Sequence, residues 1–304
     1  MKIVSFATEK GAEWGFLSEG RVYRFSGGAG GAYGSVGGLL EAGETGMDAA
    51  RDVWAKVVSG KAEEMFMGEE ERVRLLPPNP GARKVFCLAG NYAEHITEAG
   101  RKVAEQDRQT PRVFMKPPST TLRGPRDPIV IGKYAVRIDW EAELALIIGK
   151  KGKYIAANEA AGYIAGYSVF NDVSERAFKV WDRTESREID RFFDWLNGKW
   201  LDGFAPMGPC LVTRDEIADA RNLRITLKVN DQVMQDGNTG QMMFSPEEIV
   251  SFISCFVTLE PGDVIATGTP SGVGNARGIS LKPGDVVTTE IQGLGKMVNA
   301  VVKE

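Results

Sequence analysis

The chain has 304 residues, of which 43% are hydrophobic, so it can bury a large core. Its formal net charge is -4, and its lysines and arginines are scattered, which argues against a nucleic-acid surface or a polybasic membrane patch. The first residues contain too short an apolar run for a signal peptide, and no stretch reaches the roughly 18 apolar residues of a membrane helix. We therefore expect no nucleic-acid partner and no membrane partner.

Residues 1–78 are expected to form a small α/β domain. KIVSFAT, WGFLSE and RVYRFS each predict a short strand, and a helix is predicted over roughly 47–59. The glycine-rich run SGGAGGAYGSVGG lacks the strand-then-helix context and the GK[ST] ending of a phosphate-binding loop, so we interpret it as a flexible surface loop. The prolines of LLPPNPGARK interrupt any regular element, and we place the start of a second domain, residues 79–304, there.

The second domain is expected to be mostly strand. SPEEIVSFISCFVTL predicts a helix with Ser245 as N-cap, Pro246 in the first turn and Glu248 completing a capping box. LKVNDQVMQ predicts a hairpin that turns at Asn230 and Asp231. LEPGDVI and LKPGDVV each predict a Pro-Gly turn that leads into a strand. Many short strands with such turns favour a β-rich barrel or a rolled sandwich.

The stretch RIDWEAELALIIGK predicts one strand with an apolar face and an acidic face. Glu141 and Glu143 share the second face, with Cβ atoms about 6–7 Å apart from the rise of a strand. Because Ala145 and Ile147 continue that face, it is expected to enter the core, where carboxylates repel each other unless a cation neutralises them. The alternative interpretation is a solvated strand face.

SVFNDVSER supplies a third carboxylate, Asp172, at the end of another predicted strand, although the Asn-Asp pair alone would indicate only a turn. Three carboxylates without a neighbouring histidine or cysteine suit a hard cation, Mg²⁺, Mn²⁺ or Ca²⁺. The three cysteines, Cys87, Cys210 and Cys255, lie in apolar surroundings and are expected to be buried, reduced thiols. Reduced thiols are typical of a cytoplasmic protein, which is the location we predict.

His95 is the only histidine, and Glu98 follows it by three residues in LAGNYAEHITEAG. On a helical turn these two side chains share a face, so Glu98 can orient the imidazole and raise its basicity. A single histidine is more often a surface residue or a satisfied core residue, and spacing alone leaves that alternative open.

NYAEH with Glu98, FMKPPST, DWEAEL, FNDVSER, FAPMGP and GTPSGVG follow one another in an order that resembles the fumarylacetoacetate hydrolase superfamily. The resemblance covers about residues 84–300, and the first unit resembles the extra N-terminal domain of many bacterial members. It implies an α+β, mostly β protein: a mixed β-sandwich roll with a small N-terminal α/β domain. Family members are usually homodimers, so a homodimer is expected.

The resemblance also implies roles for individual residues. Glu141, Glu143 and Asp172 would bind Mg²⁺ or Mn²⁺, with Ca²⁺ as an alternative, and His95 with Glu98 would activate water. That dyad would lie on a lid, running from Glu94 through GRKVAEQDRQTP, which orders when ligand binds. The remaining implied residues contact the substrate: Lys116 and Lys199 at its oxygens, and Tyr92, Gly268, Thr269 and Ser271 in its pocket.

The chain departs from the family pattern in two places. Ala89 and Gly90 precede Asn91, where many relatives have a different pair, which alters the pocket wall. The stretch between Asp172 and Lys199 is longer and more charged than in compact members. Its arginines, Arg176, Arg183, Arg187 and Arg191, are expected to lie on a solvated charged helix, and the alternative is that one of them faces a second substrate carboxylate.

From these residues we predict a metal-dependent hydrolase that cleaves a carbon–carbon bond in an acylpyruvate-like 1,3-dioxo acid (the fumarylpyruvate or acylpyruvate class of aromatic compound catabolism) and releases pyruvate. Water activated by His95 attacks the distal carbonyl, and the pyruvate enolate leaves. The alternative is a decarboxylase, hydratase or isomerase of a 2-oxo dioic acid of the oxaloacetate or 2-hydroxymuconate type, with the same enolate chemistry. A binding protein that only inherited the fold would have lost site residues, and none of the matched positions is lost.

Overall fold

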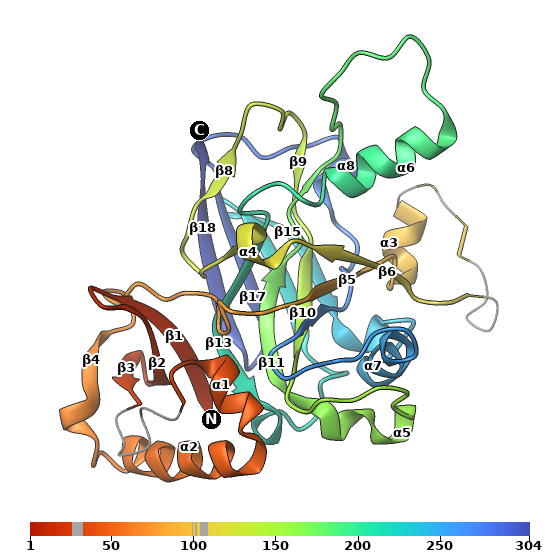
Figure 1. Ribbon diagram of the computed structural model, residues 1–304. Helices are drawn as coiled ribbons and strands as arrows, with labels where there is room; N and C mark the ends of the chain where they lie inside the picture. The colour runs from red at the N-terminus through yellow and green to blue at the C-terminus, as the bar shows by residue number, and fades with distance from the viewer. Residues whose placement is uncertain (26–32, 99, 101, 104–108) are drawn as a thin grey trace.

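The computed structural model of the chain describes residues 1–25, 33–98, 100, 102–103 and 109–304 (Figure 1). The predicted lid therefore lies partly outside the described residues. Most of the described elements are strands of two larger sheets, which mix parallel and antiparallel pairs. In the described ranges no helix combines the length and the apolar character needed to cross a membrane.

The N-terminal segment contains four strands and two helices among its described residues. Its elements are β1 (Lys2–Thr8), β2 (Gly11–Ser18), β3 (Arg21–Arg24), α1 (Val36–Glu41), α2 (Gly43–Val58), the short 3₁₀ helix η1 (Glu63–Met65) and β4 (Phe66–Glu69). The three predicted strands are confirmed, and the predicted helix begins earlier than expected. The end of the glycine-rich run is helical, because the hydroxyl of Ser35 accepts a 3.1 Å hydrogen bond from the Gly38 amide and caps α1. Residues 26–32 of the run lie outside the described residues.

The rest of the chain supplies the other strands of both sheets. Its strands are β5 (Val85–Ala89), β6 (Arg112–Lys116), β7 (Leu122–Arg123), β8 (Ile129–Ile131), β9 (Ile138–Asp139), β10 (Ala142–Ile148), β11 (Ile164–Asn171), β12 (Ser174–Glu175), β13 (Ala205–Thr213), β14 (Arg224–Val229), β15 (Gln232–Asn238), β16 (Val264–Ala266), β17 (Val286–Ile291) and β18 (Gly295–Lys303). Its helices are α3 (Ala93–Glu98), α4 (Pro118–Thr121), α5 (Ala157–Ala160), η3 (Ala161–Tyr163), α6 (Glu188–Asn197), η4 (Arg214–Glu216), η5 (Thr239–Gln241), α7 (Pro246–Ser254) and α8 (Gly274–Arg277).

The two larger sheets face each other as a sandwich. The first runs β4-β3-β2-β1-β13-β11-β10-β16-β5-β6, with β7 paired to β13, and the second runs β15-β14-β17-β18-β8. Side chains of β10, such as Leu144 and Leu146, share one buried cluster with Leu227 of β14 and Val287 of β17. The predicted mostly β sandwich is therefore confirmed, and the barrel alternative is not.

The N-terminal strands extend the first sheet, because β1 pairs with β13 through Lys2↔Val212 and Ile3↔Leu211. The N-terminal ammonium donates hydrogen bonds to Thr213 (2.6 Å) and Glu216 (2.8 Å), which fixes this junction further. The division into residues 1–78 and 79–304 remains a prediction.

Two predictions from short sequence motifs in the second half, helix α7 and one hairpin, are confirmed. Ser245 accepts a 3.2 Å hydrogen bond from the Glu248 amide, and Glu248 accepts one of 2.7 Å from the Ser245 amide, so the capping box is present. Strands β14 and β15 form the predicted hairpin, and Asn230 adopts the positive φ of 55° that its turn requires. Cys87 and Cys210 are buried, but the prediction is wrong for Cys255, which is exposed at the C-terminal cap of α7.

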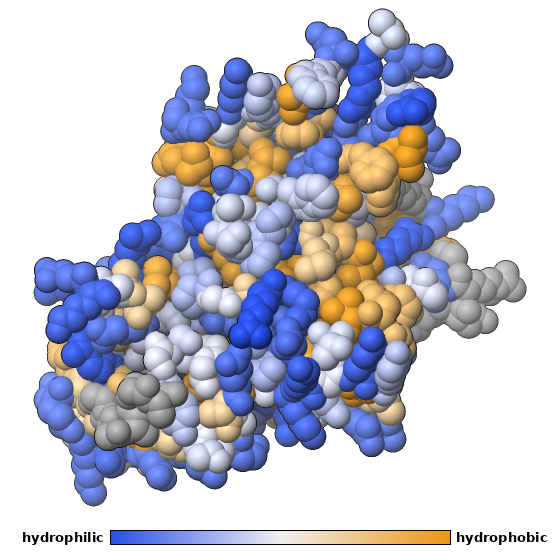
Figure 2. All heavy atoms as spheres, in the orientation of Figure 1, coloured by the Kyte–Doolittle hydropathy of each residue, from blue (hydrophilic) through white to orange (hydrophobic). Residues whose placement is uncertain are grey.

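Apolar side chains gather on the surface near α6, in the upper right of the space-filling view (Figure 2). The exposed ones in this stretch are Val180, Trp181, Ile189, Phe192, Phe193 and Trp200. Trp195 of the same helix turns inward instead and packs edge-to-face on Phe114 of β6, with ring centroids 5.2 Å apart. This contact ties α6 to the strand that carries Lys116.

Candidate active site

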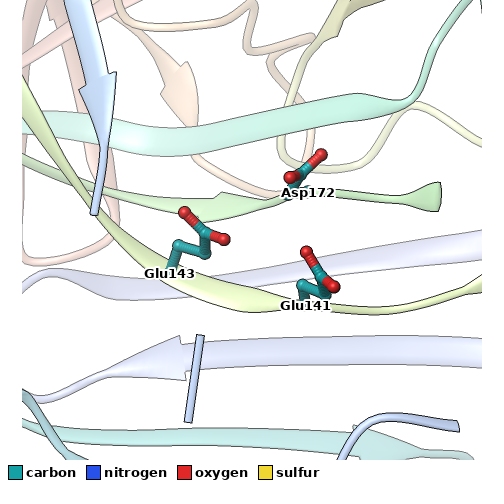
Figure 3. A group of neighbouring side chains, drawn as sticks. All are labelled: Glu141, Glu143 and Asp172. Carbon is teal, nitrogen blue, oxygen red and sulfur yellow. The ribbon is translucent and has the colours of Figure 1, made fainter. Parts of the chain in front are cut away.

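The strand pairing of β10 with β11 brings Glu141, Glu143 and Asp172 together. Ala142 lies opposite Asn171 in this antiparallel pair, so Glu141 and Asp172 follow as neighbours at the same end, and the Asp172 amide donates a 2.9 Å hydrogen bond to the Glu141 carbonyl. One ligand oxygen from each carboxylate lies within 4.8 Å of the others. Figure 3 shows the three side chains, hereafter the carboxylate cluster, pointing toward a common space.

The predicted single strand is interrupted at Trp140 and Glu141, between β9 and β10. At this point the backbone amides donate to side-chain oxygens instead of to the carbonyl groups of a neighbouring strand. Asp139 accepts hydrogen bonds from the amides of Trp140 (2.9 Å) and Gly274 (2.6 Å), and Asn171 accepts one of 3.0 Å from the Glu141 amide. The predicted burial of the acidic face is nevertheless correct, since Glu141 and Glu143 are 5% and 0% exposed.

Two buried lysines neutralise part of the cluster. Lys116, at the end of β6, donates to Asp172 at 2.5 Å and to the Val173 carbonyl at 3.0 Å. Lys199, which follows α6, donates to Glu141 at 2.6 Å and to Asp172 at 2.7 Å. Burial lowers the pKa of Lys199, but the charges of Asp172 and Glu141 outweigh it and leave the pKa above its ordinary value, so the ammonium stays charged.

Arg176 lies beside Glu141 and lines the same cavity. Its guanidinium donates hydrogen bonds to Asp139 at 2.8 Å and to Oε1 of Glu141, and its side chain is only 13% exposed. The interpretation as a solvated charged segment is therefore wrong for Arg176. Arg183 and Arg187 do form exposed ion pairs with aspartates of α6, as that interpretation expected.

Glu143 is the member of the cluster without a cationic partner in the described chain. One of its oxygens accepts a 2.8 Å hydrogen bond from the Gly268 amide, and the other, Oε1, is buried and has no hydrogen-bond partner there. Burial, followed by the charges of Asp172 and Glu141, raises the pKa of Glu143 well above its ordinary value. For Glu141, burial acts in the same direction, but the charges of Arg176 and Lys199 prevail and lower its pKa. An unpaired buried oxygen in an all-oxygen donor set fits a hard divalent cation.

The predicted dyad is formed on α3. His95 and Glu98 share one helical face, and Nδ1 of His95 lies 2.8 Å from Oε1 of Glu98. The other oxygen of Glu98 accepts a 2.8 Å hydrogen bond from the Gly272 amide, and Ser271 donates to Glu94 at 3.3 Å. Glu98 therefore orients the imidazole and also fastens α3 to the GTPSGVG loop.

The other predicted pocket residues surround the cluster. Gly268 has a positive φ of 91° and uses its amide for Glu143, while the Thr269 hydroxyl accepts a 2.8 Å hydrogen bond from the side chain of Gln235. Since Gln235 is the donor, the hydroxyl proton of Thr269 is left for another acceptor. Tyr92 is 1% exposed, and its hydroxyl has no partner among the described residues. Gln235 was not predicted, because nothing in its local pattern marks a buried glutamine on a strand distant along the chain.

A cavity of about 220 Å³ joins the dyad to the cluster. Its lining, which defines the site cavity, is Leu88, Ala89, Gly90, His95, Ile96, Arg112, Glu141, Arg176, Trp195, Lys199, Thr269, Val273, Asn275 and Ala276. A larger hollow of about 580 Å³ lies between α2 and the first sheet, but none of the predicted site residues lines it. The structure thus brings His95, Glu141, Lys199 and Thr269 to one space.

Comparisons with known proteins agree with this geometry. Residues 84–302 match the family described as fumarylacetoacetate (FAA) hydrolase C-terminal. The chain is 40% identical over 266 residues to the mitochondrial oxaloacetate tautomerase Fahd2a of Rattus norvegicus, covering 87% of this chain and 78% of that protein.

Two solved structures have the same fold over essentially their whole length. A fumarylacetoacetate hydrolase from Exiguobacterium antarcticum matches with a TM-score of 0.78 and 30% identity, covering all of both chains (100% each). The maleylpyruvate hydrolase of Sphingobium sp. SYK-6, in complex with manganese(II) and pyruvate, matches with a TM-score of 0.76 and 25% identity, covering 100% of this chain and 99% of that one. Together with the match over residues 84–302, these relatives show that the chain belongs to the fumarylacetoacetate hydrolase family.

Proposed function

We propose that this protein binds Mg²⁺ or Mn²⁺ at the carboxylate cluster and catalyses keto–enol tautomerisation of an oxaloacetate-like 2-oxo dioic acid. One observation carries the proposal: His95, which is paired with Glu98, lines the same cavity as Glu141, Lys199 and Thr269. The tautomerase name of the 40% identical rat relative supports this reaction, and the manganese and pyruvate in the Sphingobium structure support the metal and the 2-oxo acid.

The charges of the site suit an anionic substrate once a cation is present. The three carboxylates of the cluster exceed Lys116 and Lys199 by one negative charge, and Arg176 is balanced by Asp139. When bound, a divalent cation supplies Lewis acidity that stabilises negative charge on the 2-oxo oxygen. The cluster then carries one excess positive charge, which favours a negatively charged substrate.

His95 is placed to move the proton. With its own proton on Nδ1, it donates to Glu98 and presents Nε2 as the base. Nε2 takes the proton from C3 of the substrate, the C–H electron pair forms the C2=C3 bond and the C2=O π pair moves to the 2-oxo oxygen. The imidazolium of His95 then returns the proton to that oxygen, so the reaction needs no co-reactant. The ammonium groups of Lys116 and Lys199 stabilise the negative charge that develops on oxygen.

Thr269 is the residue we assign to the substrate carboxylate. Its hydroxyl oxygen is occupied by Gln235, so its proton can be donated, whereas the amide of Gly268 is already used by Glu143. A carboxylate held by this hydroxyl fixes the substrate with C3 toward the dyad.

The test is to add oxaloacetate to Mn²⁺-loaded protein and follow the ultraviolet absorbance of the enol form. We expect faster keto–enol relaxation, reversible loss of the acceleration with chelator, and loss in His95→Gln. Unchanged acceleration in excess chelator, or in His95→Gln, would contradict the proposal.

A second candidate is hydrolysis of an acylpyruvate, because the same dyad can deprotonate a water molecule and one structural neighbour is a maleylpyruvate hydrolase. Pyruvate release from acetylpyruvate or fumarylpyruvate, measured on the same preparation, distinguishes the two. Decarboxylation of oxaloacetate would release pyruvate and carbon dioxide and would persist in His95→Gln, since it needs only an electron sink. The homodimer and the cytoplasmic location remain predictions.

A further inference from the structure

We propose that Arg112 binds the distal carboxylate of the substrate and thereby selects 2-oxo dioic acids longer than oxaloacetate. The inference rests on the proposed function, in that the 2-oxo acid end of the substrate lies at the carboxylate cluster.

Strand alternation directs Arg112 toward the site. On β6, Lys116 points into the cluster, and Phe114 two residues earlier contacts Lys199, whose ammonium lies 5.3 Å from its ring centroid. Arg112 is the next residue on this face, whereas Met115 lies on the other. β6 begins beside α3 (Figure 1), and Arg112 lines the site cavity together with His95. The strand thus presents one cation at the bottom of the site and one at its mouth.

Among the described residues, Arg112 is also the arginine of the cavity that no carboxylate occupies. Arg176 is held by Asp139 and Glu141, and Lys199 is held by two members of the cluster. Arg112 is exposed and forms no ion pair with any side chain in the described ranges. A guanidinium in this position can bind a carboxylate with two parallel hydrogen bonds.

The wall between the two cations is apolar. Trp195 lines the cavity and is packed on Phe114, and Leu88 and Ile96 line it from β5 and α3. A ligand that fits this wall has a hydrocarbon middle and an anionic group at each end.

The spacing along β6 sets the length of that ligand. Lys116 lies four positions after Arg112, so their Cα atoms are about 13 Å apart at roughly 3.3 Å per residue. Both side chains leave the same face, and the head of the substrate lies at the Lys116 end. The two carboxylates of oxaloacetate are separated by a single methylene beyond the ketone, which is too short to reach from the cluster to the mouth. A longer 2-oxo dioic acid can span the distance.

The experiment measures affinities of saturated 2-oxo dioic acids of increasing length for Mn²⁺-loaded protein by calorimetry. Each is paired with the 2-oxo monocarboxylic acid of the same length, and oxalate reports on the metal end alone. The variants are Arg112→Gln and, as a matched control, Arg126→Gln, an exposed arginine that pairs with Glu70 and does not line the cavity.

We expect the wild type and Arg126→Gln to bind the longer dioic acids about tenfold more tightly than their monocarboxylic partners, the size of a bidentate, partly exposed ion pair. Arg112→Gln should lose this preference and bind oxalate as the wild type does. A preference that survives in Arg112→Gln, or an equal loss for oxalate and both series, would overturn the inference. If neither oxaloacetate nor a longer 2-oxo dioic acid is tautomerised while the Arg112-dependent preference persists, the proposed reaction is wrong and the role of Arg112 stands.

Discussion

Glu143→Gln is expected to stabilise the metal-free protein and to remove its stabilisation by metal. In the wild type, Oε1 of Glu143 is buried without a partner, and burial with the nearby charges of Asp172 and Glu141 raises its pKa above the ordinary 4.5. The glutamine can keep the hydrogen bond from the Gly268 amide through its oxygen and turn its own amide toward the neighbouring carboxylates. The substitution therefore replaces the repulsion between carboxylates by a hydrogen-bond donor that faces them.

The expected size follows from two contributions. Removing an unsatisfied buried carboxylate should raise the free energy of unfolding by about 1–3 kcal/mol, or the melting temperature by roughly 3–8 °C for a chain of this size. Mn²⁺ at about 100 times its dissociation constant should stabilise the wild type by about 2.7 kcal/mol. Glu143→Gln loses one of the three ligands, so this increment should nearly vanish. Glu290→Gln, at an exposed position of β17, is the control.

The pH dependence gives an independent check. A carboxyl whose folded pKa is raised keeps its full stability below its unfolded pKa and loses stability as pH rises through the folded value. In chelator, the wild type should therefore lose stability as pH rises above about 4.5 relative to Glu143→Gln. Thermal unfolding followed by circular dichroism measures both effects. If metal-free Glu143→Gln melts below the wild type at neutral pH, Glu143 is not a strained carboxylate. If Mn²⁺ raises both melting temperatures equally, Glu143 is not a ligand.

Three further changes probe other parts of the site and fold. His95→Ala should lower the rate of tautomerisation by about 10²–10⁴-fold with unchanged Mn²⁺ affinity, measured by stopped-flow absorbance and calorimetry; weakened Mn²⁺ binding would make the histidine a ligand. Glu98→Gln should lower activity less than His95→Ala does. Hydrogen exchange of the Gly272 amide should rise in this variant, because Glu98 accepts the hydrogen bond of that amide. Protection of the amide as in the wild type would refute the role of Glu98 in fastening α3 to the GTPSGVG loop. Ser245→Ala should lower stability by about 1 kcal/mol in urea unfolding while activity stays at the wild-type level, and no loss would show that the cap of α7 is replaceable.

Short-range patterns predicted the elements whose determinants are neighbours in sequence. The capping box of Ser245 and Glu248 needs only residues three apart, and the hairpin at Asn230 needs only a residue that tolerates positive φ. The shared helical face of His95 and Glu98 is equally local, and the structure shows their contact. These features form in the structure as expected because no distant residue competes with them.

Predictions failed where a regular element ended before its apolar pattern did. Alternation alone predicted one strand through Trp140, but Asp139 and Asn171 bind the amides at that point and end the ladder. Cys255 follows an apolar helix, yet the helix ends one residue earlier and leaves it on the surface. In each case the apolar pattern continues past the point where the backbone hydrogen bonds of the element end.

The carboxylate cluster shows which part of a site a sequence can supply. Spacing gave the shared face of Glu141 and Glu143, and the antiparallel register then places Asp172 beside Glu141. The positive charges beside these carboxylates come from Lys116 at the end of β6 and from Lys199 after α6. One lysine precedes the carboxylates in the sequence and the other follows them. Lys199 forms ion pairs with both Glu141 and Asp172, whereas Glu143, within the described chain, accepts a hydrogen bond only from the backbone amide of Gly268. Three carboxylates that are alike in sequence therefore differ in charge environment, and the unpaired negative charge that attracts a cation is concentrated on Glu143.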